Sequence, residues 1–492
     1  MNLRDLVYIP LAIATAPLWA RKARSGWGER FGKTARLPDP PAGKRRILIH
    51  AVSVGEVSAL RGLVPRLAQE AEVVLSVTTD TGTARAKALF PGTTVVRYPL
   101  DFSWSVRRFL EAVRPDAVAL VELELWPNFV DACRARGVPV CVINGRLSER
   151  SFKGYRRLRG ALKATFGSLE FAAVQDEAYA ARVEAMGVDP LRCLVTGSMK
   201  WDSVVAVEQG RVRGQASDRG EGGSEREAAD RAGDAASPDG ALAEDIASSL
   251  GIDQSRPLIV AGSTGPGEEA LLDTACRRAF PAGVQLLCAP RKPERFDEAA
   301  AALGGCVRRS AVKQSATGGG PKKSSSDGHA RFLLDTIGEL RAAYTLADVV
   351  VMGRSFGRLF GSDPIEPASL GKATVIGPRV GDFESVVRAL ESAGGLVRAT
   401  PDDLHEVLRR LIDQPGERER LALNALRCIE AQRGATARHA ALLLGLLDGR
   451  SRVDADAATP GASGARATGA ACEPGRPRPG FEAPAPTHGH RP

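Results

Sequence analysis

The residue types best suited to chemistry stand at positions 53–56, where the sequence reads Ser-Val-Gly-Glu. The preceding residues 46–52 are mostly apolar and β-prone, which predicts a buried strand. Apolar residues at helical spacing over 57–69 predict a helix, so Glu56 lies in its first turn. The carboxylate there either caps the helix, whose dipole by itself would lower its pKa, or acts as a general base at the sheet edge where ligands bind.

Other polar groups follow further predicted strands. Residues 262–268 (Gly-Ser-Thr-Gly-Pro-Gly-Glu) join a strand to a helix, and their free N–H groups suit either an anion site or a structural turn. Glu366 lies in the first turn of another predicted helix, where a carboxylate either caps the helix or accepts hydrogen bonds from ribose hydroxyls. Arg291 and Lys292 end the predicted strand 284–289 as a cation pair for phosphate or carboxylate, or lie in a solvated loop.

The first half of the chain adds similar groups. Lys200 follows Gly-Ser-Met after one predicted strand. The predicted strand 117–121 is followed by Glu122, Glu124, Trp126 and Asn128. Because the carboxyl ends of parallel strands meet at one edge of a sheet, these groups converge, and this favours the functional readings over the local structural ones. The site is expected in a cleft between two domains.

The elements that would position these groups alternate between strand and helix. Short apolar runs of strand length recur from residue 46 to about 202 and again from 257 to 376, with helical stretches between them. This rhythm predicts two α/β domains, each a doubly wound parallel sheet. The expected order is an N-terminal membrane-associated helix (1–24), a Rossmann-like domain (25–207), a disordered linker or insertion (208–243), a second Rossmann-like domain (244–447) with a polar insertion at 307–330, and a disordered tail (448–492).

The composition narrows the classes of partner. The chain has 492 residues and a formal net charge of +9, from 67 Lys and Arg against 58 Asp and Glu. A diffuse basic excess suits an anionic membrane surface or a phosphorylated substrate. Aromatic residues make up only 5% of the chain and no recognition motif is present, so nucleic acid is not an expected partner.

The cysteines and histidines lack the spacing of metal ligands. Eight cysteines are scattered without a C-x-x-C pair, and some, such as Cys141 and Cys288, lie in apolar strand-like runs. This pattern predicts reduced, buried thiols of a cytosolic protein. The six histidines form no ligand set either, so no metal site is expected.

An apolar run at residues 6–20 is followed by Arg21, Lys22 and Arg24. This run of about fifteen residues is short for a full membrane span, and it has no clear small-residue cleavage site of a removed signal. The basic cluster predicts that the bulk of the protein lies on the cytoplasmic side. We expect an interfacial or barely spanning anchor, and the alternative is an ordinary helix packed on the first domain.

Six short motifs are distinctive in combination. They read Ser-Val-Gly-Glu at 53–56, Thr-Thr-Asp-Thr-Gly at 78–82, Glu-Leu-Glu-Leu-Trp-Pro-Asn at 122–128, Asn-Gly-Arg-Leu-Ser at 144–148, Gly-Ser-Met-Lys at 197–200 and Asp-Pro-Ile-Glu-Pro-Ala-Ser-Leu-Gly at 363–371. Together they resemble the 3-deoxy-D-manno-octulosonic acid (Kdo) transferases of lipopolysaccharide synthesis, from about residue 6 to 447 apart from the two polar insertions. The resemblance implies a GT-B fold, a CMP-Kdo donor, a lipid A precursor (lipid IVA) as acceptor, inversion at the anomeric carbon without metal or cofactor, and the cytoplasmic face of the inner membrane.

The resemblance also implies roles for single residues. Glu56 is the expected general base that takes the proton from the acceptor hydroxyl. The expected contacts to the donor nucleotide are Pro290, Arg291, Ile337, Gly338, Glu339, Asp363, Pro364, Ile365 and Glu366. Further candidate site residues are Ser53, Glu124, Arg146, Lys200 and Ser263. These types fit the chemistry, since a phosphate leaving group needs cations and N–H donors and a weakly acidic alcohol needs a placed carboxylate.

The chain departs from the usual family pattern on the donor side. Ser362-Asp363 stands where His-Asn is usual, Phe360 where Gly is usual, Gly265 and Lys292 where His is usual, and Asp382 where Asn is usual. Asp363 adds a negative charge beside a nucleotide phosphate, which is unfavourable unless Arg354, Arg358 or Arg379 compensates. The departures concern the donor pocket more than the acceptor base, and they also allow an altered donor.

Two other functions stay open at this point. One is a nucleotide-sugar 2-epimerase of the same fold, which would not need the apolar N-terminus and usually needs acid/base groups on both sides of the sugar. The other is a degenerate membrane-bound scaffold without activity. The substitution Glu56→Ala separates them, because a transferase would lose turnover while a scaffold would be unaffected.

Overall fold

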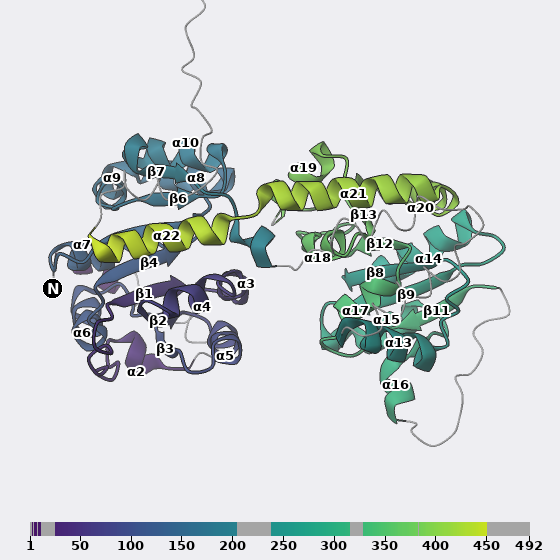
Figure 1. The fold of residues 1–492 in the computed structure, drawn as a ribbon, viewed down its shortest axis with the longest axis horizontal. Helices are drawn as coiled ribbons and strands as arrows, with labels where there is room; N and C mark the ends of the chain where they lie inside the picture. The colour runs from purple at the N-terminus through teal and green to yellow at the C-terminus, as the bar shows by residue number, and fades with distance from the viewer. Residues whose placement is uncertain are drawn as a thin grey trace, which may run out of the picture.

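The computed structural model describes residues 2, 4–6, 8–10, 25–203, 238–314, 328–381 and 383–449. This part of the chain forms two α/β domains that lie side by side (Figure 1). Each domain is built on a seven-stranded sheet with parallel strand pairs. The two doubly wound domains predicted from the alternating strand and helix patterns are confirmed.

The first sheet has the strand order β3-β2-β1-β4-β5-β6-β7. Its strands are β1 (Arg46–Ala51), β2 (Glu72–Val77), β3 (Thr94–Arg97), β4 (Ala117–Val121), β5 (Val140–Gly145), β6 (Ala172–Val174) and β7 (Cys193–Val195). The helices are α2 (Trp27–Arg30), α3 (Val54–Ala59), α4 (Leu63–Ala68), α5 (Asp80–Leu89), α6 (Ser103–Val113), α7 (Pro127–Arg134), α8 (Glu149–Arg157), α9 (Arg159–Gly167), α10 (Glu177–Met186), η1 (Pro190–Arg192) and η2 (Met199–Ser203). The chain order reverses between β1 and β4, and ligands of such sheets bind at that switch point.

The second sheet has the order β10-β11-β9-β8-β12-β13-β14 and reverses between β8 and β12. Its strands are β8 (Leu258–Thr264), β9 (Gln285–Pro290), β10 (Val307–Arg308), β11 (Ala330–Leu333), β12 (Val349–Met352), β13 (Ala373–Ile376) and β14 (Val397–Arg398). Its helices are α13 (Pro238–Leu250), α14 (Glu268–Ala279), η3 (Pro293–Arg295), α15 (Phe296–Ala302), α16 (Arg309–Gln314), α17 (Leu340–Leu346), α18 (Ile365–Ser369), α19 (Glu384–Ser392), α20 (Leu404–Asp413) and α21 (Pro415–Gln432). One more helix, α22 (Ala435–Asp448), follows α21 in the chain.

Each sheet is buried on both faces, which explains why its strands are apolar without alternation. In β1, Leu48 packs into the core on one face of the sheet, while Ile47 and Ile49 pack into the core on the other. The second sheet is likewise covered on both faces, since Val260 and Ile259 of β8 belong to different cores.

The last two helices cross from one domain to the other. Figure 1 shows α21 along the second domain and α22 along the first. Leu443 and Leu447 of α22 pack in the core beside β1 and α4. The expected second domain ran to residue 447, but the structure puts α22 on the first domain, because its apolar residues cover a face of that sheet that would otherwise be exposed.

The helix predicted over 57–69 is divided into α3 and α4 in the structure. The last helical stretch of the described chain is likewise divided, into α21 and α22 at Gly434, which has a φ of 92°. Asp202 accepts hydrogen bonds from the backbone N–H of Gly434 at 2.8 Å and of Thr436 at 2.6 Å. A residue distant in sequence therefore caps α22, and apolar periodicity alone could not predict this break.

The expected polar insertions are shorter than predicted. The segment 208–243 overlaps α13, which begins at Pro238 because Ala243 and Ile246 pack in the core of the second domain. The segment 307–330 begins with β10 and α16, and Arg309 in it is buried. The rest of these two segments, most of the expected N-terminal helix 1–24, and the tail after residue 449 lie outside the described residues. Among the helices that the structure does describe, none has the length and apolarity to cross a membrane.

Candidate functional site

The carboxyl group of Glu56 lies at the switch point of the first sheet, where β1 leads into α3. Ser53 is the N-cap of α3, and its hydroxyl oxygen accepts the Glu56 N–H at 3.4 Å. The Glu56 carboxylate accepts the Val52 N–H at 2.8 Å. These two bonds resemble a capping box, so Glu56 does help to fix the start of the helix, as the capping reading expects.

Burial gives Glu56 the acidity of a general base. The side chain is only 9% exposed. Its pKa is raised to about 7, mainly by burial and to a smaller extent by the nearby carboxylates of Glu122 and Glu124, while the hydrogen bond from the Val52 N–H acts in the opposite direction. The helix dipole by itself is expected to lower this pKa, but the pKa of Glu56 is raised overall. A carboxyl group that titrates near neutral pH can accept a proton from an alcohol and release it again.

Glu122 and Glu124 follow β4, the strand beside β1 at the switch point. The indole N–H of the exposed Trp126 donates to Glu124 at 3.2 Å, and burial raises the pKa of Glu124. Glu122 holds this corner through its backbone, since its carbonyl oxygen accepts the Arg146 N–H at 3.0 Å. The structure thus brings the sequence-predicted Ser53, Glu56, Glu124 and Arg146 to one edge of the first sheet.

Strained backbone marks the same edge in both domains. Positive φ values occur at Glu122 (62°), Asn144 (51°), Ser263 (56°) and Arg354 (60°), which all lie at or just beyond the carboxyl ends of strands. Non-glycine residues in this conformation cost about 1–3 kcal/mol each and gather at functional sites. Such strain at both switch points supports the assignment of these edges as the working surface of the protein.

A side chain of the loop 262–268 already binds one of the loop's N–H groups and two from a neighbouring loop. The buried carboxylate of Glu268 accepts the N–H groups of Gly265 at 2.7 Å, Arg354 at 2.5 Å and Phe356 at 3.0 Å. Glu268 therefore fastens the loop after β8 to the loop after β12. The structure favours the structural reading of this turn, in which a side chain occupies the place of an external anion.

The segment 363–366 lies at the start of α18, as predicted. The Asp363 carboxylate accepts the Ile365 N–H at 3.0 Å. Pro364 and Ile365 are buried, and Ile365 packs in the core of the second domain. Glu366 is partly exposed, and burial, with a smaller effect of Asp363, raises its pKa. Asp363 and Glu366 are thus the partly exposed residues of the segment, and the two buried residues between them position both.

Two cations act on the unusual Asp363. Burial raises the pKa of this carboxyl group, and the charges of Lys200 and Arg291 lower it. The compensating cations are these two, rather than the expected Arg354, Arg358 and Arg379. Lys200 comes from η2 of the first domain, and its ammonium group lies 5.3 Å from the ring centroid of Phe383 in the second domain. Lys200 therefore reaches from one domain to the donor side of the other.

Arg291 follows the buried Pro290 at the end of β9, and its N–H donates to the Thr264 carbonyl at 3.1 Å. Its charge acts on Asp363 and also on the phenol of Tyr344, which Glu366 influences as well. Tyr344 thus marks the point where the predicted Arg291, Asp363 and Glu366 converge. Sequence reasoning missed Tyr344, whose position depends on Gly262, since a Cβ there would lie 1.9 Å from its hydroxyl oxygen.

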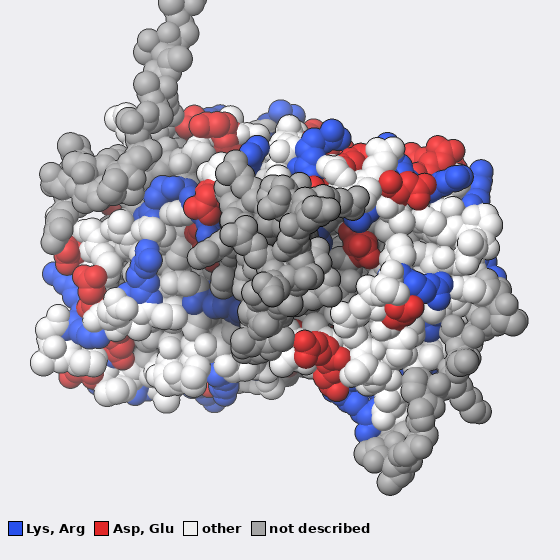
Figure 2. All heavy atoms as spheres, turned by 45° about the vertical axis from the view of Figure 1, so that its right-hand side comes forward, with Lys and Arg blue, Asp and Glu red and all other residues white. Residues whose placement is uncertain are grey.

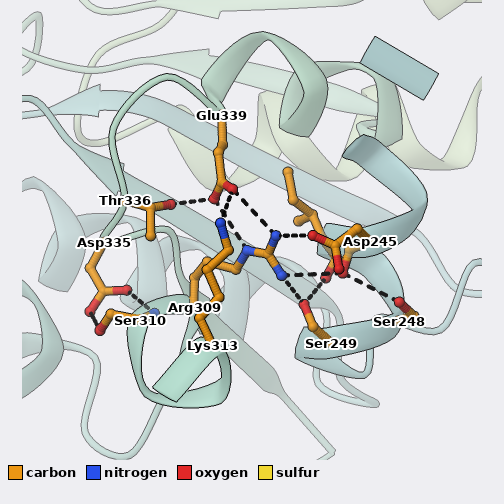
Figure 3. Close-up of polar contacts among 10 residues, drawn as sticks. Asp245, Ser248, Ser249, Arg309, Ser310, Lys313, Asp335, Thr336 and Glu339 are labelled. Carbon is orange, nitrogen blue, oxygen red and sulfur yellow. Dashed lines mark hydrogen bonds and ion pairs between the residues drawn. The ribbon is translucent and has the colours of Figure 1, made fainter. Parts of the chain in front are cut away.

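The loop 337–339 has an exposed tip and a buried base. Ile337 is 74% exposed. Gly338 has a φ of 93°, and a Cβ there would meet no atom within 4 Å. Glu339 is buried among Arg309, Lys313 and Thr336 (Figure 3). Burial opposes ionisation of Glu339, but hydrogen bonds from these three residues outweigh it and lower its pKa to about 2.

The other unusual residues have distinct settings. The Ser362 hydroxyl is buried without a hydrogen-bond partner in the described part of the chain. Phe360 is 55% exposed and Lys292 is exposed. A Cβ at Gly265 would lie 3.0 Å from Leu359, so a larger residue there requires that side chain to move. Asp382 lies outside the described residues.

Three further observations concern residues away from this site. A cavity of about 580 Å³ opens along α8, lined by Glu149, Arg150, Lys153, Gly154 and Arg157, none of them a predicted site residue. The seven cysteines from Cys133 to Cys428 form no disulfide, and five of them are buried. Within the described ranges, no three His, Cys, Asp or Glu side chains gather as metal ligands would.

Comparison with known proteins assigns the chain to a family. The family model of 3-deoxy-D-manno-octulosonic-acid transferase (kdotransferase) matches residues 25–203. The 3-deoxy-D-manno-octulosonic acid transferase of Bordetella pertussis is 32% identical over 444 residues, which cover 86% of this chain and 93% of that protein. The corresponding protein of Haemophilus influenzae is 28% identical, over 88% of this chain and 93% of its own length.

Solved structures support the fold. The UDP-GlcNAc 2-epimerase of Neisseria meningitidis bound to UDP-GlcNAc superposes with a TM-score of 0.50 over 82% of this chain and 100% of that chain, at 12% identity. At this identity the likeness concerns the fold alone, which is the GT-B arrangement of two parallel-sheet domains. With the sequence match over nearly the whole length of the Bordetella protein, the chain belongs to the Kdo transferase family of glycosyltransferases.

Proposed function

We propose that this protein transfers Kdo from CMP-Kdo to a lipid A precursor, lipid IVA, with inversion at the anomeric carbon and with Glu56 as the general base. The observation that carries this proposal is the buried Glu56 carboxyl group at the first switch point, with its pKa of about 7. Membership of the Kdo transferase family indicates which sugar is transferred. The charged groups of the second domain are the proposed binding site of the nucleotide.

In the proposed reaction, an acceptor hydroxyl oxygen forms a bond to the anomeric carbon of Kdo as the bond from that carbon to the CMP phosphate oxygen breaks. The hydroxyl proton passes to the Glu56 carboxylate, and the electron pair of the broken bond leaves with CMP. Lys200 and Arg291 stabilise the charge that grows on the phosphate. Glu366 accepts hydrogen bonds from the ribose hydroxyls. No step requires a cofactor or a metal ion.

The proposed base and the proposed nucleotide site lie on different domains, which is compatible with inversion. Glu56 belongs to the first domain, whereas Arg291, Asp363 and Glu366 belong to the second. A base and a leaving-group site on different domains allow attack and departure on opposite faces of the sugar. Lys200, which reaches from the first domain to Phe383 of the second, would couple donor binding to the approach of the two domains.

We further propose that the protein works at the cytoplasmic face of the inner membrane. The described N-terminal residues indicate where an anchor would start, because buried Asp5 accepts hydrogen bonds from the Ser103 N–H at 2.9 Å and from the Asn128 amide at 3.3 Å. Ser103 begins α6 and Asn128 lies in α7, both at the carboxyl edge of the first sheet. An anchor that starts there would bring the acceptor lipid to the edge that carries Glu56.

The proposal is tested by sugar transfer from CMP-Kdo to lipid IVA, followed by mass spectrometry of the lipid. We expect a gain of one or more Kdo units, and the mass gives their number. Glu56→Gln keeps the size of the side chain and is expected to reduce kcat about 100- to 10,000-fold, with little change in the affinity for CMP. The matched control is Glu111→Gln on the exposed face of α6, which should keep full activity.

Each other outcome contradicts a defined part of the proposal. Transfer by wild type that survives Glu56→Gln would remove Glu56 from the role of base. CMP binding without transfer to lipid IVA would assign a different acceptor. The absence of both CMP binding and transfer would mean that the changed residues Ser362, Asp363 and Lys292 belong to a pocket for another donor or to a scaffold.

A further inference from the structure

We propose that Arg309 is a positioning residue for donor binding, which fixes the loop 335–339 through the carboxylate of Glu339 so that the exposed tip of the loop meets the nucleotide. This inference rests on the proposed function and goes beyond it, because it assigns a role to a side chain on α16 that touches no substrate. It also changes the expected role of Glu339 from a nucleotide contact to the point by which the loop is held.

The geometry begins with the burial of Arg309, which is only 1% exposed. Its guanidinium donates to both oxygens of Glu339, at 3.2 Å and 3.3 Å. It also pairs with Asp245 and donates to the Ser249 hydroxyl, both on α13 (Figure 3). The planar guanidinium thus joins the loop to α13 with a fixed fork of donors.

The carboxylate of Glu339 has no capacity left for a ribose. Besides Arg309, it accepts hydrogen bonds from the Lys313 ammonium at 2.5 Å and from the Thr336 hydroxyl. The side chain of Glu339 is 6% exposed, whereas Ile337 is 74% exposed. Because a buried charge-assisted network of this kind is rigid, the loop has a fixed base and an open tip.

The neighbouring Asp335 is fastened in the same way. Its carboxylate accepts the Ser310 N–H at 2.7 Å, the Ser310 hydroxyl at 2.5 Å and the Arg308 guanidinium at 2.7 Å. Both ends of the loop 335–339 are therefore bound to the short segment 308–313, which comprises the end of β10 and most of α16. Between them, Gly338 has open space on all sides of its Cβ position, which allows a planar base or a phosphate to approach the backbone.

The experiment measures CMP affinity by calorimetry, together with the KM for CMP-Kdo and kcat, for wild type, Arg309→Ala and Glu339→Gln. We expect both variants to bind CMP at least tenfold more weakly and to raise the KM for CMP-Kdo, with kcat at saturating donor changed less than threefold. The matched control is Arg331→Ala, which removes another buried arginine of the same domain, paired with Asp273 of α14. The control should lower the melting temperature without changing CMP affinity.

A double variant separates positioning from direct contact. If Arg309 acts through Glu339, the loss in Arg309→Ala/Glu339→Gln should be no greater than that of the larger single variant. Losses that multiply would overturn the inference, because Glu339 would then contact the nucleotide itself. Should Arg309→Ala not fold, Glu339→Gln and Arg309→Lys carry the same comparison.

The remaining outcomes distinguish this inference from the proposed function. If wild type binds CMP and Arg309→Ala binds it equally well, the positioning role is wrong and the proposed function stands. If Arg331→Ala weakens CMP binding as much as Arg309→Ala does, the effect is one of general stability and the inference is overturned. If wild type does not bind CMP, the proposed function fails and the inference fails with it.

Discussion

The acidity of Glu56 is decided by residues that are far from it in sequence. Its place in the first turn of α3 is visible in the sequence and favours ionisation through the helix dipole. Burial and the carboxylates of Glu122 and Glu124 act in the opposite direction and prevail. Because these neighbours come from the next strand of the sheet, the sequence could indicate the base but not its pKa.

The pH dependence of the reaction follows from this arrangement. The base must be ionised to accept a proton, so kcat/KM should rise with pH and level off above an apparent pKa of about 7. In Glu122→Gln a negative charge near Glu56 is lost, so its pKa falls and the rising limb moves to lower pH. Rates measured across the pH range for both proteins test this, with Glu111→Gln as the control. A limb that stays in place in Glu122→Gln would show that Glu122 does not act on the base.

Asp363 offers a second test at this scale. Its carboxyl group interacts electrostatically with Lys200 and Arg291, the two cations that are proposed to bind the donor phosphate. Asp363→Asn should free them and lower the KM for CMP-Kdo about three- to tenfold, equivalent to roughly 1 kcal/mol. Asp402→Asn, on an exposed turn, is the matched control. A higher KM in Asp363→Asn would mean instead that the carboxylate itself contacts the donor.

Among the elements, α22 is held on the first domain by several polar contacts, and a buried histidine makes one of them. His439 is fully buried, and its Nε2 accepts the Asn144 N–H at 2.8 Å while its Nδ1–H donates to the Ala435 carbonyl at 2.7 Å. Only a neutral ring with this tautomer can make both bonds. Burial accordingly lowers the pKa of His439 to about 4.

This predicts a loss of stability in mild acid. Between the ordinary histidine pKa of 6.5 and the folded value of about 4, the unfolded chain binds the proton more readily, so stability falls as the pH falls through this window. The contribution of His439 lost between about pH 7.5 and pH 5 is about 2 kcal/mol. Urea titrations should show a loss of stability between the two pH values that is about 2 kcal/mol smaller in His439→Gln than in wild type, because the buried His50, whose pKa burial lowers to about 3, contributes equally in both proteins. His405→Gln, in the second domain, should lose as much stability between the two pH values as wild type does. An equal loss in His439→Gln would refute the assignment.

The elements themselves were largely predictable, because strands buried on both faces leave continuous apolar runs. All strands of four residues or more were indicated in this way, whereas the two-residue strands β10 and β14 are too short to carry a pattern. The breaks at Gly62 and Gly434 and the fastening of two loops by Glu268 depend on tertiary partners. The site was predictable as a set of strand ends, but Tyr344, Glu268 and Arg309 were not, because their partners are brought together only by the fold.

For the whole molecule, the basic excess is spread rather than concentrated on the face that Figure 2 shows, where acidic and basic side chains alternate. A diffuse charge of +9 attracts an anionic membrane weakly and is screened by salt. If the protein works at the membrane as proposed, we expect firm attachment to depend on the apolar run at residues 6–20.

Vesicle sedimentation tests this division between charge and apolar contact. Wild type should bind anionic vesicles even at about 0.5 M salt, where charge is screened. The triple variant Leu11→Asn, Ile13→Asn, Leu18→Asn keeps Asp5 and its contacts, and it should bind only at low salt. The control is Leu191→Asn, which changes an 80% exposed leucine of the first domain. Binding of the triple variant at high salt would show that the attachment has another source.

The crossing of α22 onto the first domain has a consequence for how such proteins can be recombined. The first domain is completed by residues 435–448, which follow the entire second domain in the chain. A hybrid that takes its acceptor half from one relative and its donor half from another therefore needs two junctions, one after residue 203 and one near Gly434. A single crossover would pair each sheet with a foreign closing helix, so exchange of halves between relatives should succeed only when both ends of the gene travel together.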